Sequence, residues 1–237
     1  MRSVVDFHSH ILPEIDDGSA SVEESIAMLQ MEYEQGIKHV IATPHFYARR
    51  DNLEQFMERR ARSEQMLRKE LARHIGLPEL IVGAEVHFFT GISNSKAISN
   101  LVIDSTKCIL IEMPYPPWTK EMYHELEQIH SKQGLVPIIA HVDRYISRFR
   151  TFGIPQKLAE LPVLVQANAE FFLDRHTSSM ALRMLREDRI HLLGSDCHNL
   201  KSRKPNLEAA LNLIRKRLGE DALERINLYE SDVLADC

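Results

Sequence analysis

The sequence predicts an α/β protein, and more narrowly a distorted (β/α)7 TIM-like barrel, from three observations. Short apolar segments alternate with longer amphipathic ones along the chain, which is the pattern of parallel strands connected by helices. The apolar segments are continuous, so each strand is expected to be covered on both faces. Polar residues that can bind metals follow these segments repeatedly, and barrel enzymes carry their functional groups at that edge.

Seven apolar segments have the length and composition of strands. The first leads directly into His8-Ser9-His10, and each of the others is bounded by turn-forming or polar residues. Pro137 is expected near the start of its strand, because proline cannot donate a hydrogen bond within a central sheet. The expected strands are 4–7, 39–43, 80–84, 107–111, 136–140, 162–167 and 190–194.

The segments between these strands have helical periodicity. Ser21 and Glu24 form a capping box that opens the first helix, which carries Ile26, Leu29 and Tyr33 on one side. A long, heavily charged helix follows the second strand, and a pair of helices closes the chain. The expected helices are 21–36, 52–74, 119–132, 179–187, 206–218 and 221–226.

Length and composition favour a single globular domain over residues 1–237, since no linker, repeat or low-complexity tract divides the chain. The formal net charge of −5 argues against a nucleic-acid-binding protein, which would carry a basic excess. No apolar run approaches the roughly 20 residues of a membrane-spanning helix, so membrane insertion is not expected. The lack of a signal-peptide pattern and the odd count of three cysteines favour a cytoplasmic location.

His8 and His10 share one face of the first strand, because side chains two residues apart in an extended segment point the same way. Taken alone, the pair is either half of a metal site or a polar strand cap. The other strand ends favour the metal site, since five further strands supply ligand-type residues. Ligands from six separate strands also favour a barrel over an open sheet, which would concentrate them at one switch point. The candidate ligands are His8, His10, His45, Glu85, Glu112, His141, Asp196 and His198, with Asp17 on the first loop.

Nine such side chains exceed what one ion can use, so two or three ions are expected. Mixed histidine and carboxylate ligation suits Mn²⁺, Fe²⁺ or Zn²⁺, and the lack of cysteine ligands argues against a structural zinc site. Closely spaced ions are typical of phosphate-ester hydrolysis, because they activate water, hold the phosphate and stabilise the leaving oxygen. The residues therefore predict a multinuclear, metal-dependent hydrolase of phosphate esters.

These strand-end motifs resemble those of the polymerase and histidinol phosphatase (PHP) family. Within it, the chain most resembles the manganese-dependent protein-tyrosine phosphatases encoded with bacterial capsule and exopolysaccharide genes. The resemblance covers nearly the whole chain in the right order. It rests on His8-Ser9-His10, Asp16-Asp17-Gly18, Thr43-Pro44-His45, Gly83-Ala84-Glu85, Ile111-Glu112, the run from Ile139 to Tyr145, and Ser195-Asp196-Cys197-His198-Asn199.

The resemblance implies a distorted barrel with three divalent metals, Mn²⁺ first, with Fe or Zn as alternatives. It also implies that Glu85 bridges two of the ions. The implied ligand sets are His8, His10, Glu85 and Asp196 for the first ion, Glu85, Glu112 and His141 for the second, and Asp17, His45 and His198 for the third.

Two arginines match the family's phosphate-binding positions, Arg144 in His-Val-Asp-Arg-Tyr and Arg203 in Asn-Leu-Lys-Ser-Arg. A guanidinium presents a planar fork to phosphate oxygens and keeps its charge, although either arginine could instead be a surface charge or an ion-pair partner. The chain departs from the family in the loop from Phe46 to Asp51, which follows His45 and bears on substrate choice. Glu85 and His141 complete the expected catalytic set.

The resemblance implies a phosphotyrosyl protein as substrate, such as a bacterial tyrosine kinase that controls polysaccharide export. The alternatives are a small-molecule phosphoesterase, such as a histidinol-phosphate phosphatase, and a catalytically silent binding domain. Cys197 to Arg203 also reads as C-x5-R, the spacing of a cysteine-dependent phosphatase. That mechanism needs a glycine-rich phosphate loop and a low-pKa thiolate, and the five intervening residues contain no glycine, so the match is interpreted as coincidence.

Overall fold

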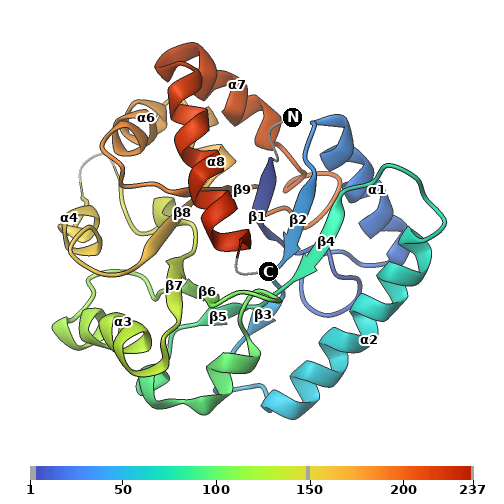
Figure 1. Cartoon of the computed structure of the whole chain (residues 1–237), viewed down its shortest axis with the longest axis horizontal. Coiled ribbons are helices and arrows are strands. Elements are labelled where there is room, and N and C mark those ends of the chain that lie inside the picture. The colour runs from blue at the N-terminus through green and yellow to red at the C-terminus, as the bar shows by residue number, and fades with distance from the viewer. Residues whose placement is uncertain (1–3, 148–149, 236–237) are drawn as a thin grey trace.

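The computed structural model describes residues 4–147 and 150–235 and has an α/β fold in which a curled parallel sheet is surrounded by helices (Figure 1). All strand pairings between the named strands are parallel. The strands are β1 (Val5–Ser9), β2 (His39–Ala42), β3 (His45–Phe46), β4 (Glu79–Val82), β5 (Glu85–His87), β6 (Cys108–Glu112), β7 (Val136–Ile139), β8 (Leu164–Asn168) and β9 (Leu192–Gly194).

The described strands form two sheets, in the orders β1-β2-β4 and β3-β5-β6-β7-β8-β9. A bridge between Ser9 and Cys197 connects β1 to the segment after β9, so the curl returns to its first strand. The expected second and third strands are each broken into two. Pro44, which has no N–H, separates β2 from β3, and Gly83 lies between β4 and β5. The break is bridged where the Glu85 N–H donates to the carbonyl of Pro44 at 3.0 Å.

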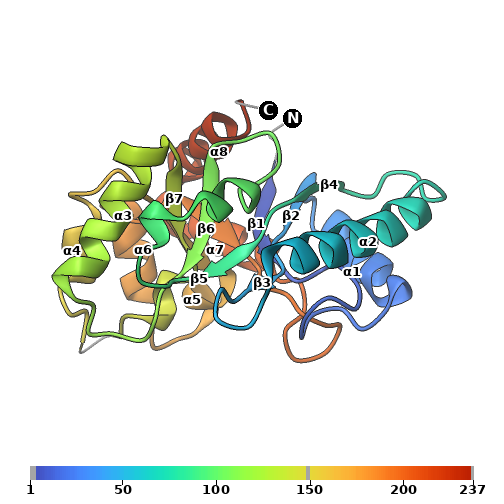
Figure 2. The same cartoon turned by 90° about the horizontal axis from the view of Figure 1, so that it is seen from below.

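Most helices lie outside the strands, with α1 and α2 side by side on one flank and α3 and α4 on the opposite flank (Figures 1 and 2), whereas α8 lies across the middle of the view in Figure 1. Short α4 and α5 were not expected from the sequence, and α8 is longer than expected. The helices are α1 (Val22–Glu34), α2 (Leu53–Leu71), α3 (Lys120–Gln133), α4 (Ile154–Leu158), α5 (Ala169–Leu173), α6 (Ser178–Arg186), α7 (Leu207–Leu218) and α8 (Glu220–Leu234), with 3-10 turns η1 (Ile92–Asn94), η2 (Lys96–Asn100) and η3 (Val142–Arg144).

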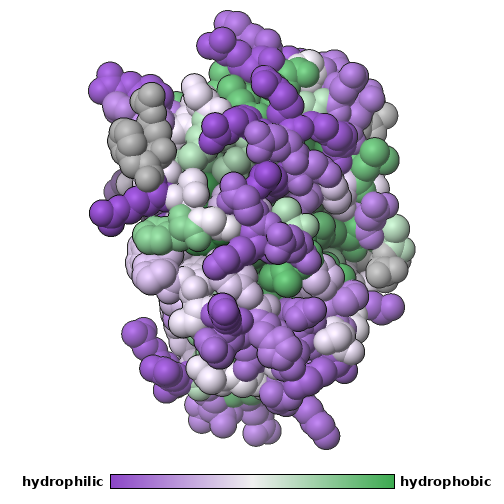
Figure 3. Space-filling model, turned by 90° about the vertical axis from the view of Figure 1, so that its left-hand side faces the viewer, coloured by the Kyte–Doolittle hydropathy of each residue, from purple (hydrophilic) through white to green (hydrophobic). Residues whose placement is uncertain are grey.

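Two hydrophobic clusters make up the core. The larger one fills the layer between the strands and the helices, and it includes Met28 and Leu29 of α1. The smaller one collects Phe7, Leu110 and Ile138 from separate strands together with Val233 of α8, so α8 packs against the strands' inner side. The outer face over α4 and α6 is mostly hydrophilic (Figure 3).

Helix α1 buries Leu29 fully and Ile26 in part, as expected, but its buried face is shifted away from Tyr33. Tyr33 is 42% exposed, whereas Glu32 is completely buried. Glu32 is accommodated because its carboxyl group hydrogen-bonds to Asp6 of β1, and burial raises its pKa well above the ordinary value. Apolar periodicity could not predict this, since it assigns a carboxylate to the solvent side.

Because the strands are parallel, the loops that follow their carboxyl ends all lie on one side of the molecule. The N-terminus and α8 lie at the opposite end of the strands (Figure 2). The segments that follow β1, β3, β5, β6, β7 and β9 therefore converge. No helix in the described part of the chain is long and apolar enough to cross a membrane.

Candidate metal centre

Strand β1 brings His8 and His10 into the centre, where both rings are buried. The backbone of two neighbouring segments comes very close to these histidines, at Gly18 and at Gly194. A Cβ on Gly18 would lie 2.2 Å from the His10 carbonyl oxygen, and a Cβ on Gly194 would lie 2.6 Å from the Cβ of His8. Only glycine fits at these two positions, so the loops after β1 and β9 can close directly over the histidines.

Glu85 of β5 lies in the middle of the imidazoles. Its Oε1 is 2.7 Å from Nε2 of His141, and its Oε2 is 2.9 Å from Nδ1 of His45. The same Oε2 is 3.2 Å from Nε2 of His8 and 3.3 Å from Nε2 of His10. One buried carboxylate thus contacts four histidines from three different strand ends.

His141 and Asp196 follow β7 and β9 in a left-handed backbone conformation, with φ of 33° and 53°. This conformation costs a non-glycine residue roughly 1 kcal/mol or more, and such residues concentrate at functional sites. The turn directs both side chains into the centre, where His141 is fully buried and Asp196 is 3% exposed.

The structure brings all nine predicted side chains into one contiguous cluster. Four overlapping groups each have their ligand atoms within 4.8 Å of one another: His10, Asp17, His45 and His198; His8, Glu85 and His141; His8, His10 and Asp196; and His45, Glu85 and Glu112. Asp17, His45 and His198 occur together, as the resemblance implies, with His10 added. Asp17 is the most solvent-exposed member, with 67% of its side chain accessible at the rim.

Three histidines are oriented by hydrogen bonds on the ring nitrogen that faces away from the cluster. Nδ1 of His8 lies 3.3 Å from Oε1 of Gln166, and Nδ1 of His10 lies 2.8 Å from Oδ2 of Asp16. Nδ1 of His198 lies 3.0 Å from the Asp196 carbonyl oxygen. Because these oxygens can only accept, each Nδ1 carries a proton, and Nε2 is the ring nitrogen that faces the cluster.

Asp16 and Gln166 are therefore site residues that were absent from the predicted ligand set. Asp16 also accepts a hydrogen bond from the His45 N–H at 3.0 Å, so it orients two ligand segments. The adjacent acidic pair with Asp17 was a signal for it. Gln166 lies within β8, where the sequence carries no recognisable motif, and only its position opposite His8 reveals its role.

The residues fit a metal-binding role by their own chemistry. The Nε2 of His198 and the Oε2 of Glu85 are buried, and neither makes a hydrogen bond of good geometry, although imidazole nitrogens surround the Glu85 oxygen. Buried polar atoms are nearly always satisfied in folded proteins, so these two atoms need another partner. A lone pair and a carboxylate oxygen directed into the same cluster are ligands for a divalent cation.

The ionisation states of Glu85 and His198 also fit a metal-binding role. Burial opposes ionisation of Glu85, yet the surrounding imidazoles, His8 foremost, hold its pKa well below the ordinary value. Burial, together with the charge of His10, lowers the pKa of His198 to about 4. Glu85 is therefore an anionic carboxylate and His198 a neutral imidazole, the forms that bind metal. Against the effect of burial, neighbouring carboxylates raise the pKa of His8 and His10, so these two rings must release a proton to bind a metal ion.

Both candidate phosphate-binding arginines contact the carboxylate of Asp196. Arg144 Nη2 donates to Oδ2 of Asp196, and Arg203 Nη2 lies 2.7 Å from Oδ1 of the same carboxylate. The side chains are 32% and 37% exposed, so each guanidinium also faces solvent. Both line a hollow of about 360 Å³, where Lys201 and Lys204 add positive charge and Asp143 and Glu170 add carboxyl groups.

Cys197 is unsuited to nucleophilic catalysis. Its side chain is fully buried, and burial together with the Glu32 and Asp6 carboxyl groups raises its pKa well above the ordinary value. A catalytic cysteine needs an accessible, low-pKa thiolate. The C-x5-R spacing is therefore coincidental, as interpreted from the sequence.

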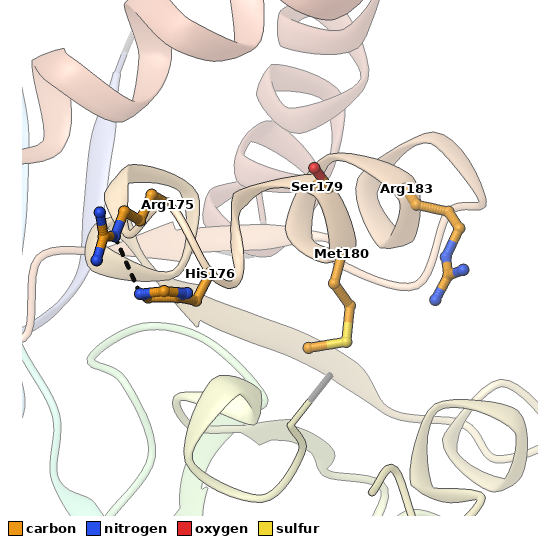
Figure 4. Close-up of a pocket in the computed structure, with 5 residues that line it drawn as sticks. All are labelled: Arg175, His176, Ser179, Met180 and Arg183. Carbon is orange, nitrogen blue, oxygen red and sulfur yellow. Dashed lines mark hydrogen bonds between the residues drawn. The ribbon is translucent and has the colours of Figure 1, made fainter. Parts of the chain in front are cut away.

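A further hollow of about 320 Å³ lies at α6, between Arg175, His176 and Arg183 (Figure 4). Arg175 donates a hydrogen bond to His176 at 3.0 Å, and both side chains are exposed. This hollow shares no lining residue with the histidine cluster, so it is not part of the same site.

A curled parallel α/β sheet whose strand ends concentrate histidines and carboxylates beside two arginines is the arrangement of the metal-dependent hydrolase class. Residues 4–235 match the family described as "Capsular polysaccharide synthesis, CpsB/CapC", so the chain belongs to that family, and the relationship expected from the motifs is confirmed.

The chain is similar to proteins of this family over most of its length. It is 28% identical to tyrosine-protein phosphatase YwqE of Bacillus subtilis (strain 168), covering 92% of this chain and 86% of that protein. It is 27% identical to tyrosine-protein phosphatase CpsB of Streptococcus pneumoniae, covering 91% of each. A solved structure described as YwqE and CpsB, "unique metal-dependent tyrosine phosphatases", matches with a TM-score of 0.83, 25% identity and coverage of 98% of this chain and 95% of that one.

Proposed function

We propose that this protein is a metal-dependent protein-tyrosine phosphatase. The observation that carries the proposal is the cluster of nine ligand-type side chains, with oriented histidines, beside two arginines that can grip a phosphate. The relatives named as tyrosine-protein phosphatases, and the structural neighbour described as metal-dependent, support the same activity.

We infer three divalent ions, Mn²⁺ first, with Fe or Zn as alternatives. Following the sets implied by the resemblance, His8, His10, Glu85 and Asp196 would hold one ion, Glu85, Glu112 and His141 a second, and Asp17, His45 and His198 a third. When bound, such ions would lower the pKa of water, hold the phosphate and neutralise charge on the leaving oxygen.

The protein's own residues have separate tasks in this proposal. Arg144 and Arg203 would bind the non-reacting phosphate oxygens, since each guanidinium has further N–H groups beyond those that contact Asp196. Glu85 and His141, joined at 2.7 Å, would hold one another in position at the centre. Asp6 would keep β1 and the turn after β9 in register, because its Oδ1 accepts hydrogen bonds from the backbone of both His8 and Ser195.

We also propose that the chain is one domain and that its strands occupy seven barrel positions. Counting β2 with β3 and β4 with β5 gives seven positions in the order of the sheets. As substrate we propose a phosphotyrosyl protein, in particular a bacterial tyrosine kinase that regulates polysaccharide export. The family description, which refers to capsular polysaccharide synthesis, supports this partner.

The test compares a phosphotyrosyl peptide with histidinol phosphate on metal-replete protein, with and without chelator. We expect metal-dependent hydrolysis with higher kcat/KM for the peptide. Glu85→Gln should lower metal content and reduce kcat/KM on the order of 1,000-fold, because it removes the central anionic ligand. Glu79→Gln, an exposed change on β4, is the matched control. Preference for histidinol phosphate, or full activity in metal-free protein, would contradict the proposal.

A further inference from the structure

The loop between β3 and α2 borders a hollow of about 440 Å³ beside the metal centre. Tyr47, Arg49 and Arg50 of this loop form one wall, and His87, Phe88 and Met122 form part of the other. The volume lies within the range of small-molecule and side-chain binding sites in proteins.

Two residues that line the hollow, Tyr47 and His87, contact proposed metal ligands. The ring of Tyr47 has its centre 5.3 Å from that of His45 and 5.4 Å from that of His87. His87 in turn hydrogen-bonds through Nδ1 to Oε2 of Glu112 at 2.9 Å. A peptide whose phosphate reached the centre would therefore extend its neighbouring residues over Tyr47 and His87.

Two positive charges at the edge of this hollow are uncompensated. Arg49 and Arg50 are exposed, and in the described part of the chain neither forms an ion pair. The nearby Asp51 is already engaged, because it accepts hydrogen bonds from the Tyr47 N–H at 2.8 Å and from Arg59 at 2.9 Å. The guanidinium of Arg50 lies 5.0 Å from the centre of the Tyr47 ring, which keeps it at the hollow.

We propose, on the basis of the proposed function, that this hollow binds the residues flanking phosphotyrosine and that Arg49 and Arg50 select substrates with an anionic side chain there. The chain carries a net charge of −5, so two unpaired arginines beside a site rich in carboxylates form a local reversal of charge. Their partner is a carboxylate or a second phosphate within a few residues of the phosphotyrosine. An apolar floor that includes Phe88 would hold the peptide between these charges and the metal centre.

The test uses the whole metal-replete chain and three phosphotyrosyl peptides. The peptides differ at one position within a few residues of the phosphotyrosine, which is glutamate, glutamine or phosphoserine. We expect wild-type kcat/KM to favour the glutamate peptide over the glutamine peptide by about 5- to 20-fold, mainly through KM, as two exposed ion pairs would give. For each enzyme, selectivity is the ratio of kcat/KM for the glutamate peptide to kcat/KM for the glutamine peptide. Higher salt should reduce this ratio, because exposed charges are screened.

In the double variant Arg49→Gln/Arg50→Gln the ratio should fall to near 1. The matched control is Arg62→Gln/Lys69→Gln, which removes the same charge from exposed positions on α2 and should keep the wild-type ratio. Equal wild-type turnover of all three peptides, or a ratio unchanged in the Arg49/Arg50 variant, would overturn the inference. Failure of the proposed function would look different, since wild-type protein would then hydrolyse neither the peptides nor phenyl phosphate.

Discussion

Individual histidines of the centre are prepared for their role by single hydrogen bonds. His10 illustrates this, because Asp16 both accepts the Nδ1 proton and opposes the effect of burial. Although burial would lower the pKa of His10, Asp16 and Glu85 raise it to about 10. The imidazole is therefore held in place by carboxylates before any cation binds, and binding must displace its second proton.

At this scale we predict that Cys197→Ser retains most activity. The thiol is buried and its raised pKa keeps it protonated, so it cannot act as a nucleophile. We expect kcat/KM on a phosphotyrosyl peptide to stay within about threefold of wild type, with metal content unchanged. An inactive variant that still carried its full metal content would reopen the cysteine mechanism.

Arg144→Ala should also keep a normal metal content, but unlike Cys197→Ser it should lose much of its kcat/KM. Loss of a charge-assisted phosphate contact in a shielded site costs on the order of 2–4 kcal/mol, or roughly 30- to 1,000-fold. Metal analysis beside steady-state kinetics checks this. Arg150→Ala, a change at an exposed arginine outside the centre, is the control. Unchanged kcat/KM in Arg144→Ala would mean that the arginine serves only as an ion-pair partner of Asp196.

Among the secondary-structure elements, α8 carries an unusual buried carboxyl group. Glu230 is 2% exposed, and burial together with the neighbouring Asp6 raises its pKa from 4.5 to about 8. The folded protein therefore keeps the Glu230 proton between about pH 4.5 and pH 8, whereas the unfolded chain releases it. Because the native state then binds more protons, Glu230 lowers the free energy of unfolding as pH rises through that window.

Glu230→Gln should remove this pH dependence. The variant and wild type should be about equally stable near pH 4.5, and the variant should be more stable by about 2–4 kcal/mol near pH 8. Urea denaturation across this pH range measures the difference. Asp232→Asn, an exposed change on the same helix, should alter stability little at either pH. A variant no more stable than wild type at pH 8 would mean that Glu230 ionises normally.

At the scale of the whole molecule, the candidate ligands come from six segments distributed around the curled sheet. Any ion held by them would connect β1, β3, β5, β6 and the turns after β7 and β9. Such cross-connection affects global stability, because ligands that bind only the folded state stabilise it by mass action.

Removing metal with a chelator should therefore lower the melting temperature. One ion at 100-fold its Kd contributes about 2.7 kcal/mol, which corresponds to roughly 5–10 °C for a chain of this size. Calorimetry of chelated, Mn²⁺-restored and Mg²⁺-supplemented protein tests this, and Mn²⁺ should recover the loss more fully than Mg²⁺. Identical melting temperatures with and without metal would indicate that the cluster binds no ion tightly.

The sequence by itself determined the class of fold and the candidate ligands. Continuous apolar segments have few alternatives to buried parallel strands, and a histidine or carboxylate after several of them is a local pattern that needs no contact information. His45 and Glu85 nevertheless begin the short strands β3 and β5, because the breaks at Pro44 and Gly83 could not be located from apolar runs. His8 and Glu112 lie within the last residues of β1 and β6 and do not follow them, since these strands continue into polar residues.

Only the tertiary structure decided which residues support and surround those ligands. Gln166 and Asp16 act by lying opposite His8 and His10, and Glu32 is buried because Asp6 lies across from it. The hollow at Arg50 depends on loops that are distant in sequence. These features arise from pairs of residues brought together by folding, and periodicity along a single chain carries no record of such pairs.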